Sequence, residues 1–182
     1  MISESLAKAL SDQVNAEYYS AYLYQAMSSY AEDAALKGAA NWLWAQAREE
    51  MAHAIHMYQY ILDRGAIPEF TSIEAPPAPH SYKNLLDVFE AVLAHEEKVT
   101  ARINNIATLA MRENDHACYQ FIMWYVNEQV EEESNAKGNI DRLKLVGDNT
   151  GQLLTFDQEL AARVYVNPFP TDTKLSGASA TA

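Results

Sequence analysis

The amino-acid sequence predicts an all-α protein, built as a four-helix bundle with one long crossover connection and a short fifth helix near the C-terminus. Three observations support this fold class. All six prolines lie in two short segments, 68–79 and 168–170. Because proline breaks helix interiors, the chain keeps two long proline-free stretches, each long enough for two helices. In both stretches apolar residues recur at steps of three and four, the period of a buried helix face.

Glycines and polar residues divide these stretches into individual helices. The four long helices and the short fifth one are expected over about residues 5–34, 38–64, 82–112, 116–145 and 152–164. Gly65 and Gly147 supply C-terminal stops for the second and fourth helices. Residues 1–165 are therefore interpreted as one domain. Residues 166–182, which are rich in Pro, Thr, Ser, Gly and Ala, are interpreted as an irregular or disordered tail.

The connection between the second and third helices is long enough to cross the bundle. Residues 66–80 contain four prolines and show no helical period. Extended chain of this length reaches up to ~50 Å, whereas a helix of ~28 residues is about 42 Å long. The two helices can therefore run parallel, as in bundles with one long crossover. A plain disordered linker between two helical hairpins is the alternative.

Amino-acid composition indicates which partners and which cellular compartment suit this chain. The 13 basic and 25 acidic residues give a formal net charge of −12, which argues against nucleic acid and suits the capture of cations. No segment approaches the ~18 consecutive apolar residues of a membrane span. The single cysteine, Cys118, cannot form an internal disulfide, and residues 1–10 show no secretory signal. We therefore expect a soluble cytoplasmic protein with neither nucleic acid nor membrane as a partner.

Each long helix carries a glutamate near the middle of its predicted buried stripe. In the third helix the stripe is apolar except at Glu96, and the acids of the other helices are Glu17, Glu50 and Glu132. The middles of packed bundle helices lie at the same level of the core whether the helices run parallel or antiparallel. The four carboxylates are therefore expected to converge. Unpaired carboxylates in a core cost several kcal/mol each. The cluster therefore predicts bound cations.

Two divalent cations balance the charge of four carboxylates. Glu50-x-x-His53 and Gln129-x-x-Glu132 each place two side chains on one helix face, one turn apart, so His53 and Gln129 add neutral donors. This oxygen-rich set with one imidazole disfavours structural zinc and suits iron or manganese. Zinc remains a competitor. One Glu-x-x-His motif is weak evidence by itself, and the prediction depends on the coincidence of all four helices.

At these positions the sequence resembles the bacterial non-haem ferritins, which belong to the ferritin-like di-iron superfamily. The shared motifs are Asn15–Tyr19 with Tyr24, Arg48–His53, His95–Glu96 and Trp124–Glu133. The resemblance covers nearly the whole chain as far as residue 162. It implies the ferritin-like form of the predicted bundle.

The resemblance also implies a ligand set for two irons. One iron is expected at Glu17, Glu50 and His53, and the other at Glu50, Glu96 and Glu132, so that Glu50 bridges the pair. In the related bacterioferritins the fourth helix carries a second Glu-x-x-His, whereas here it carries Gln-x-x-Glu. This departure makes the two metal positions unequal, which suits irons that are oxidised and then released.

Other residues near the two irons have roles implied by the same resemblance. Tyr24, two helical turns after Glu17, is expected to take part in the redox chemistry, and Gln129 to act beside the bridging Glu50. Met51 matches the haem-ligating methionine of bacterioferritins but recurs in non-haem ferritins, so no haem is expected.

Three further acids stand one residue off the buried stripe: Glu49, Glu128 and Glu131. In the ferritins that the sequence resembles, similar residues form a third iron position beside the pair. A solvated acidic flank explains them equally well, and both interpretations stay open at this point.

The function implied is that of an iron-storage subunit with ferroxidase activity, oxidising Fe(II) with O2 or H2O2 and storing ferric mineral in a shell of twenty-four copies. A rubrerythrin-like peroxidase is a rival, but its added Cys-x-x-Cys motifs need more than one cysteine. The miniature ferritins that protect DNA often have basic tails, and the only cation beyond residue 166 is Lys174. An inert helical scaffold is the alternative from another class, and it predicts no iron uptake.

Overall fold

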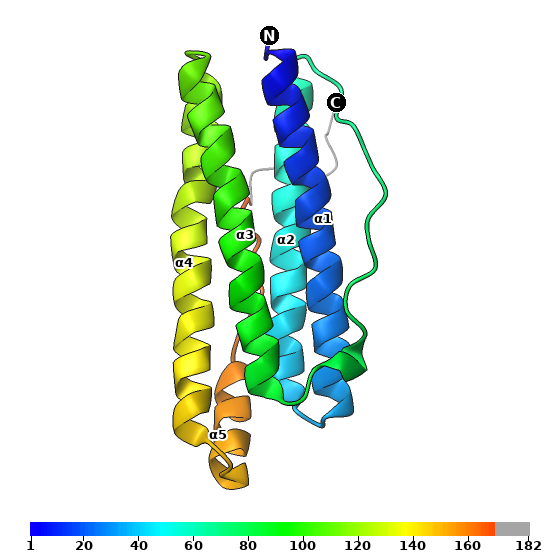
Figure 1. Cartoon of the computed structure of the whole chain (residues 1–182), viewed down its shortest axis with the longest axis vertical. Helices are drawn as coiled ribbons and strands as arrows, with labels where there is room; N and C mark the ends of the chain where they lie inside the picture. Colours follow the sequence, from blue (N-terminus) through cyan, green and yellow to red (C-terminus); the bar gives the residue numbers. More distant parts are fainter. Residues whose placement is uncertain (170–182) are drawn as a thin grey trace, which may run out of the picture. The chain divides into compact units, whose positions relative to one another are not determined.

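The computed structural model describes residues 1–169 and contains only helices and connecting segments in that part of the chain (Figure 1). The helices are α1 (Glu4–Asp33), α2 (Lys37–Asp63), the short 3-10 helix η1 (Pro79–Ser81), α3 (Leu85–Arg112), α4 (His116–Val146) and α5 (Thr150–Leu160). The predicted all-α class is confirmed. The described chain forms two compact units, residues 1–79 with 159–169, and residues 80–158.

The expected limits of two helices, α3 and α5, were wrong. α3 begins at Leu85, not at residue 82, because the Asn84 side chain accepts a hydrogen bond from the Asp87 backbone N–H at 2.9 Å and caps the helix there. α5 begins at Thr150 and ends at Leu160, not at 152 and 164. The residues after 163 have no helical backbone, and residues 170–182 of the predicted tail lie outside the described residues.

In the first unit, α1 and α2 form a hairpin. The Ser3 side chain caps α1 by accepting from the Leu6 N–H at 3.2 Å, and a turn with Ala35 at a φ of 59° joins the two helices. Predicted stripe positions of both helices are buried, with one correction. The three-and-four period also placed Tyr60 on the stripe of α2, but Tyr60 is half-buried and Ile61 takes the core position. The reason is that a helix of 3.6 residues per turn drifts away from a strict 3.5-residue stripe.

The connection after α2 runs beside α1 as an extended segment (Figure 1). Asn15 Nδ2 donates to the Glu69 carbonyl at 2.8 Å, and the Thr71 N–H donates to Asn15 Oδ1 at 3.0 Å. The Phe70 ring also lies 6.3 Å from the ring of Tyr18. Side chains of α1 therefore hold this segment in place, contrary to the alternative of a disordered linker.

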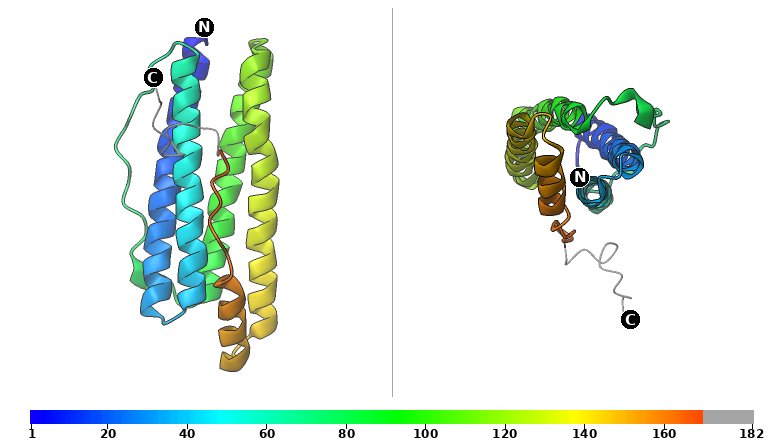
Figure 2. Two further views of the ribbon diagram at one scale, coloured as in Figure 1. Left: turned by 180° about the vertical axis from the view of Figure 1, so that it is seen from behind. Right: turned by 90° about the horizontal axis from the view of Figure 1, so that it is seen from below.

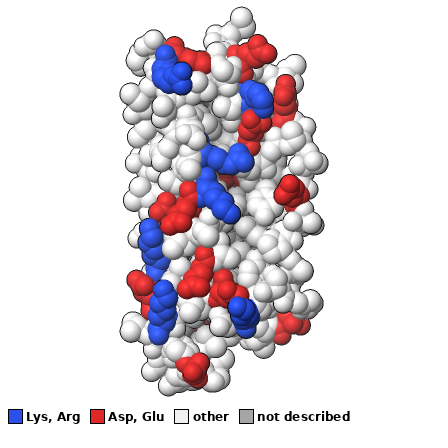
Figure 3. All heavy atoms as spheres, in the orientation of Figure 1, with Lys and Arg blue, Asp and Glu red and all other residues white. Residues whose placement is uncertain are grey.

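In the second unit, α3 and α4 form another hairpin. Asp115 caps α4 by accepting from the Cys118 N–H at 2.9 Å. All predicted stripe residues of both helices are buried, including the single cysteine. No described helix is long and apolar enough to cross a membrane. On the face drawn in Figure 3, acidic and basic side chains are interspersed.

Candidate metal centre

A buried cluster on α1 and α2 contains two carboxylates and one imidazole. Glu17, Glu50 and His53 are each at most 3% exposed, and each offers one ligand atom within 4.8 Å of the others. His53 Nδ1 lies 3.6 Å from Glu50 Oε2, one helical turn away on the same face of α2. Carboxylate oxygens with an imidazole nitrogen are ligands that iron and zinc both accept. We call these three residues the α1–α2 cluster.

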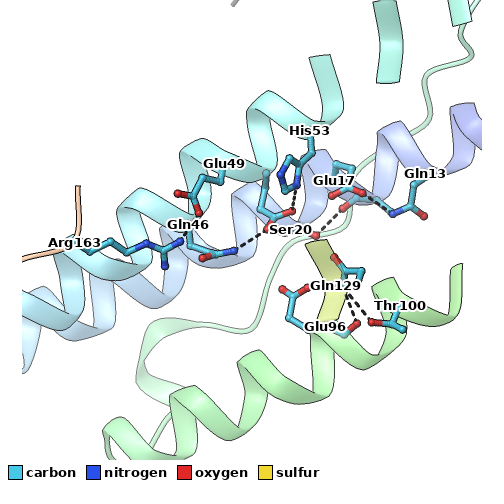
Figure 4. A network of polar contacts seen from close by, with 12 residues as sticks. Gln13, Glu17, Ser20, Gln46, Glu49, His53, Glu96, Thr100, Gln129 and Arg163 are labelled. Atoms are coloured by element: carbon cyan, nitrogen blue, oxygen red, sulfur yellow. Dashed lines mark hydrogen bonds and ion pairs between the residues drawn. The ribbon is translucent and has the colours of Figure 1, made fainter. Parts of the chain in front are cut away.

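Buried glutamines orient both carboxylates of the α1–α2 cluster. Gln13 Nε2 donates to Glu17 Oε1 at 2.7 Å (Figure 4). Gln46 Nε2 donates to Glu50 Oε1 at 3.1 Å. Each glutamine precedes its glutamate by four residues, so both lie on the same helix face. Glu17 Oε2 is buried and accepts no hydrogen bond, which leaves that oxygen available to a cation. Sequence reasoning assigned these glutamines no role, although their spacing from the acids was visible.

Burial raises the pKa of Glu17 well above its usual value, and the neighbouring Glu50 carboxylate raises it further, against a smaller opposing effect of His53. A cation bound between Glu17 and Glu50 offsets the repulsion between their two carboxylates. Metal binding is therefore expected to displace a proton from Glu17 and to become tighter as the pH rises.

The raised pKa of Glu17 predicts a pH effect on the metal-free protein. A raised folded-state pKa contributes stability that is present below the unfolded value, near 4.5, and is lost as the pH rises through the folded value. Glu17→Gln removes the titration and keeps an acceptor for Gln13. We expect the metal-free variant to melt about 2–8 °C above wild type at pH 8, with a smaller difference in melting temperature at pH 5.

Thermal melting followed by circular dichroism tests this prediction, and the exposed Glu97→Gln is the control. The same difference at both pH values contradicts it.

A second buried group lies on α3 and α4. Glu96, Gln129 and Glu132 are 1%, 6% and 5% exposed. Gln129 Nε2 donates to Glu96 Oε2 at 3.1 Å, to the Glu96 carbonyl at 3.3 Å and to Thr100 Oγ1 at 3.3 Å. The Thr100 hydroxyl donates in turn to Glu133 Oε1 at 2.8 Å. These bonds engage the amide nitrogen of Gln129, so its oxygen is the atom that remains for a cation. Glu96, Gln129 and Glu132 are called the α3–α4 cluster.

The Thr100 hydroxyl is expected to affect the reaction of the bound metal, because it orients Gln129. Thr100→Val keeps the shape of the side chain but removes the hydroxyl that links Gln129 to Glu133. A net hydrogen bond of about 1 kcal/mol predicts a fall of about five-fold in the rate of metal oxidation. Stopped-flow absorbance measures that rate. Thr155→Val is the control, because the exposed Thr155 hydroxyl bonds only within α5, to the Gly151 carbonyl. Equal rates in both variants contradict this role.

The remaining predicted site residues have diverse surroundings. Tyr24 is fully buried in the first unit, and Met51 is 37% exposed. Glu128 is half-buried and Glu131 is exposed. Glu49 forms an ion pair with Arg163 (Figure 4). Sequence reasoning missed Arg163, because no local pattern relates it to a residue so far away along the chain.

Comparison with known proteins gives consistent matches over most of the chain. The ferritin family, described as a ferritin-like domain, matches residues 7–146. The bacterial non-heme ferritin of Staphylococcus haemolyticus is 42% identical over 165 residues, which cover 91% of this chain and 98% of that protein. The bacterial non-heme ferritin of Staphylococcus aureus (strain COL) is 38% identical with the same coverage. A solved open-pore ferritin from the hyperthermophilic archaeon Archaeoglobus fulgidus matches with a TM-score of 0.87 and 43% identity, covering 90% of this chain and 100% of that chain.

Proposed function

This chain belongs to the ferritin family, and we propose that its two buried clusters act together as one ferroxidase centre for two irons. Iron storage with oxidation of Fe(II) is the activity of a non-haem ferritin, and iron binds at a site of carboxylates and histidine. The observation that carries the proposal is the α1–α2 cluster, because its three ligand atoms lie within 4.8 Å of one another in the core.

The proposed ligand set assigns a role to each buried acid. Glu17 and His53 hold the first iron, Glu96 and Glu132 hold the second, and Glu50 bridges the two. These buried carboxylates supply the negative charge that two cations balance. Gln129, whose amide nitrogen is engaged by Glu96 and Thr100, turns its oxygen toward the second iron.

In the proposed reaction each Fe(II) gives one electron to O2. The oxygen molecule takes up two protons and becomes hydrogen peroxide, and both irons become Fe(III). With H2O2 as the oxidant, the same two electrons and two protons break the O–O bond and give two waters. The ferric ions then react with water, release protons and leave as mineral. The protein mainly positions the two metals so that both electrons are available together.

Tyr24 is proposed to donate an electron when O2 needs more than the two that the irons supply. The residue is fully buried on the stripe that also carries Glu17, about 10 Å along the helix axis. Tyr24→Phe keeps the packing and removes the hydroxyl. We expect oxidation to slow about two- to five-fold and a tyrosyl radical signal in rapid-freeze electron paramagnetic resonance to disappear. The exposed Tyr22→Phe is the control. An unchanged rate and radical signal in Tyr24→Phe contradict the redox role.

The proposal extends to assembly and compartment. We infer a hollow shell of twenty-four copies that stores the mineral in its interior, in the cytoplasm, and that binds no haem. Support comes from the whole-chain likeness to ferritins and from the acidic composition, with a net charge of −12, which favours cation capture. The accessory third iron position expected at Glu49, Glu128 and Glu131 is not part of this proposal, because Arg163 already pairs with Glu49.

Loading the metal-free protein with Fe(II) in the absence of oxygen, followed by exposure to air, tests the function. Two Fe(II) per subunit are expected to bind, and about one O2 is expected to be consumed for each pair. An inert helical scaffold takes up no iron and consumes no O2 beyond the buffer blank. Such a result overturns the proposal.

A further inference from the structure

The segment that follows α5, residues 161–169, lies along α2 within the first unit (Figure 2). Its successive residues contact α2 at successive positions. Asn41 Nδ2 donates to the carbonyls of Ala161 and Arg163 at 3.3 and 2.9 Å. The Arg48 guanidinium lies 3.9 Å from the centre of the Tyr165 ring. We call residues 161–169 the α2 strap.

The far end of the α2 strap packs against two histidines of α2, His56 and the proposed iron ligand His53. Phe169 is 8% exposed. Its ring stacks on His56 with centres 3.7 Å apart, and it meets the His53 ring edge-on at 6.1 Å. The strap is therefore packed against α2 at both ends, although it forms no regular secondary structure.

Between these two ends, Arg163 of the α2 strap pairs with Glu49, one of the three acids that stand off the buried stripe. The Arg163 guanidinium pairs with Glu49 and lies 4.3 Å from the centre of the Trp42 ring. The side chains of Arg163 and Glu49 are only 20% and 17% exposed, so water screens this pair less than a surface ion pair. The indole face adds a cation–π contact to the guanidinium.

We propose that Arg163 is a positioning residue that keeps Glu49 from binding metal, so that the centre takes two metal ions per subunit and a third is excluded. This inference rests on the proposed function. A metal ion that uses Glu49 must first displace the guanidinium, which then loses its carboxylate in a partly buried place. Glu49 stands one residue before the bridging Glu50, so a third ion held by Glu49 would lie beside the centre.

Zinc binding to the metal-free assembled protein tests this proposal without any redox reaction. Zn(II) alone is titrated by isothermal calorimetry, and the bound metal is counted by elemental analysis after gel filtration. The variants are Arg163→Gln, the double variant Arg163→Gln with Glu49→Gln, and Arg48→Gln. Arg48→Gln is the matched control, since it removes an equal charge from a contact with the same strap but does not touch Glu49.

Wild type and Arg48→Gln are expected to bind two Zn(II) per subunit. Arg163→Gln is expected to bind a third, at least about ten-fold tighter than any third ion on wild type, and the double variant is expected to return to two. The proposal is overturned if wild type already binds three, if Arg163→Gln stays at two, or if the control or the double variant also gains an ion. A wild type that binds no zinc at all instead contradicts the proposed metal centre, so the two failures are distinguishable.

Discussion

Glu50→Ala is expected to lower the initial rate of Fe(II) oxidation by about 100-fold or more. Glu50 is the proposed bridge between the two irons, so its loss removes a ligand from both positions at once. Gln46 and His53 then face a cavity where a carboxylate stood, since Glu50 Oε1 accepts from Gln46 and Glu50 Oε2 lies 3.6 Å from His53 Nδ1. Binding of both metal ions is expected to weaken together.

The protein itself is expected to stay folded in Glu50→Ala. Removing one of several buried carboxylates relieves repulsion in the metal-free state, which offsets the loss of packing. Stopped-flow absorbance gives the oxidation rate, and circular dichroism gives the helix content. Exposed Glu97→Ala on α3 is the control and is expected to oxidise iron at the wild-type rate. A wild-type rate in Glu50→Ala ends the assignment of Glu50 as the bridge.

Substitutions in the α3–α4 cluster are expected to separate metal binding from oxidation. In Glu96→Ala or Glu132→Ala, the α1–α2 cluster keeps all its ligands, so one metal ion per subunit is expected to bind. The second ion loses a carboxylate, and the reaction that needs both electrons is expected to slow by about 100-fold. Glu50→Ala, in contrast, is expected to weaken both ions.

Anaerobic Fe(II) titration followed by Mössbauer spectroscopy distinguishes these cases, because the two irons have different ligands and give separate signals. The expected result is a single ferrous species in Glu96→Ala and two in wild type. Two unchanged species with normal oxidation contradict the proposal that the α3–α4 cluster holds an iron. Loss of both signals also contradicts it, since that result assigns the first iron to a site that depends on α3.

The sequence was sufficient to predict features that depend on neighbours in the chain. Proline placement set the long helices, and the three-and-four period identified the buried stripes that carry Glu17, Glu50, Glu96 and Glu132. Helix geometry alone relates residues three or four apart, so the pairing of Glu50 with His53 followed from their spacing. The fifth helix was predicted with wrong limits, because it is short and its end depends on what the following residues contact.

Only the tertiary structure decided which distant residues act on the site. The pairing of Arg163 with Glu49 joins positions 114 residues apart, and the stacking of Phe169 on His56 likewise depends on the path of the chain after α5. Asn15 holds the segment after α2 by bonds to Glu69 and Thr71. No periodic pattern relates such residues, since their contact depends on where the backbone returns to a helix already formed and on which side chains then fill the space between them.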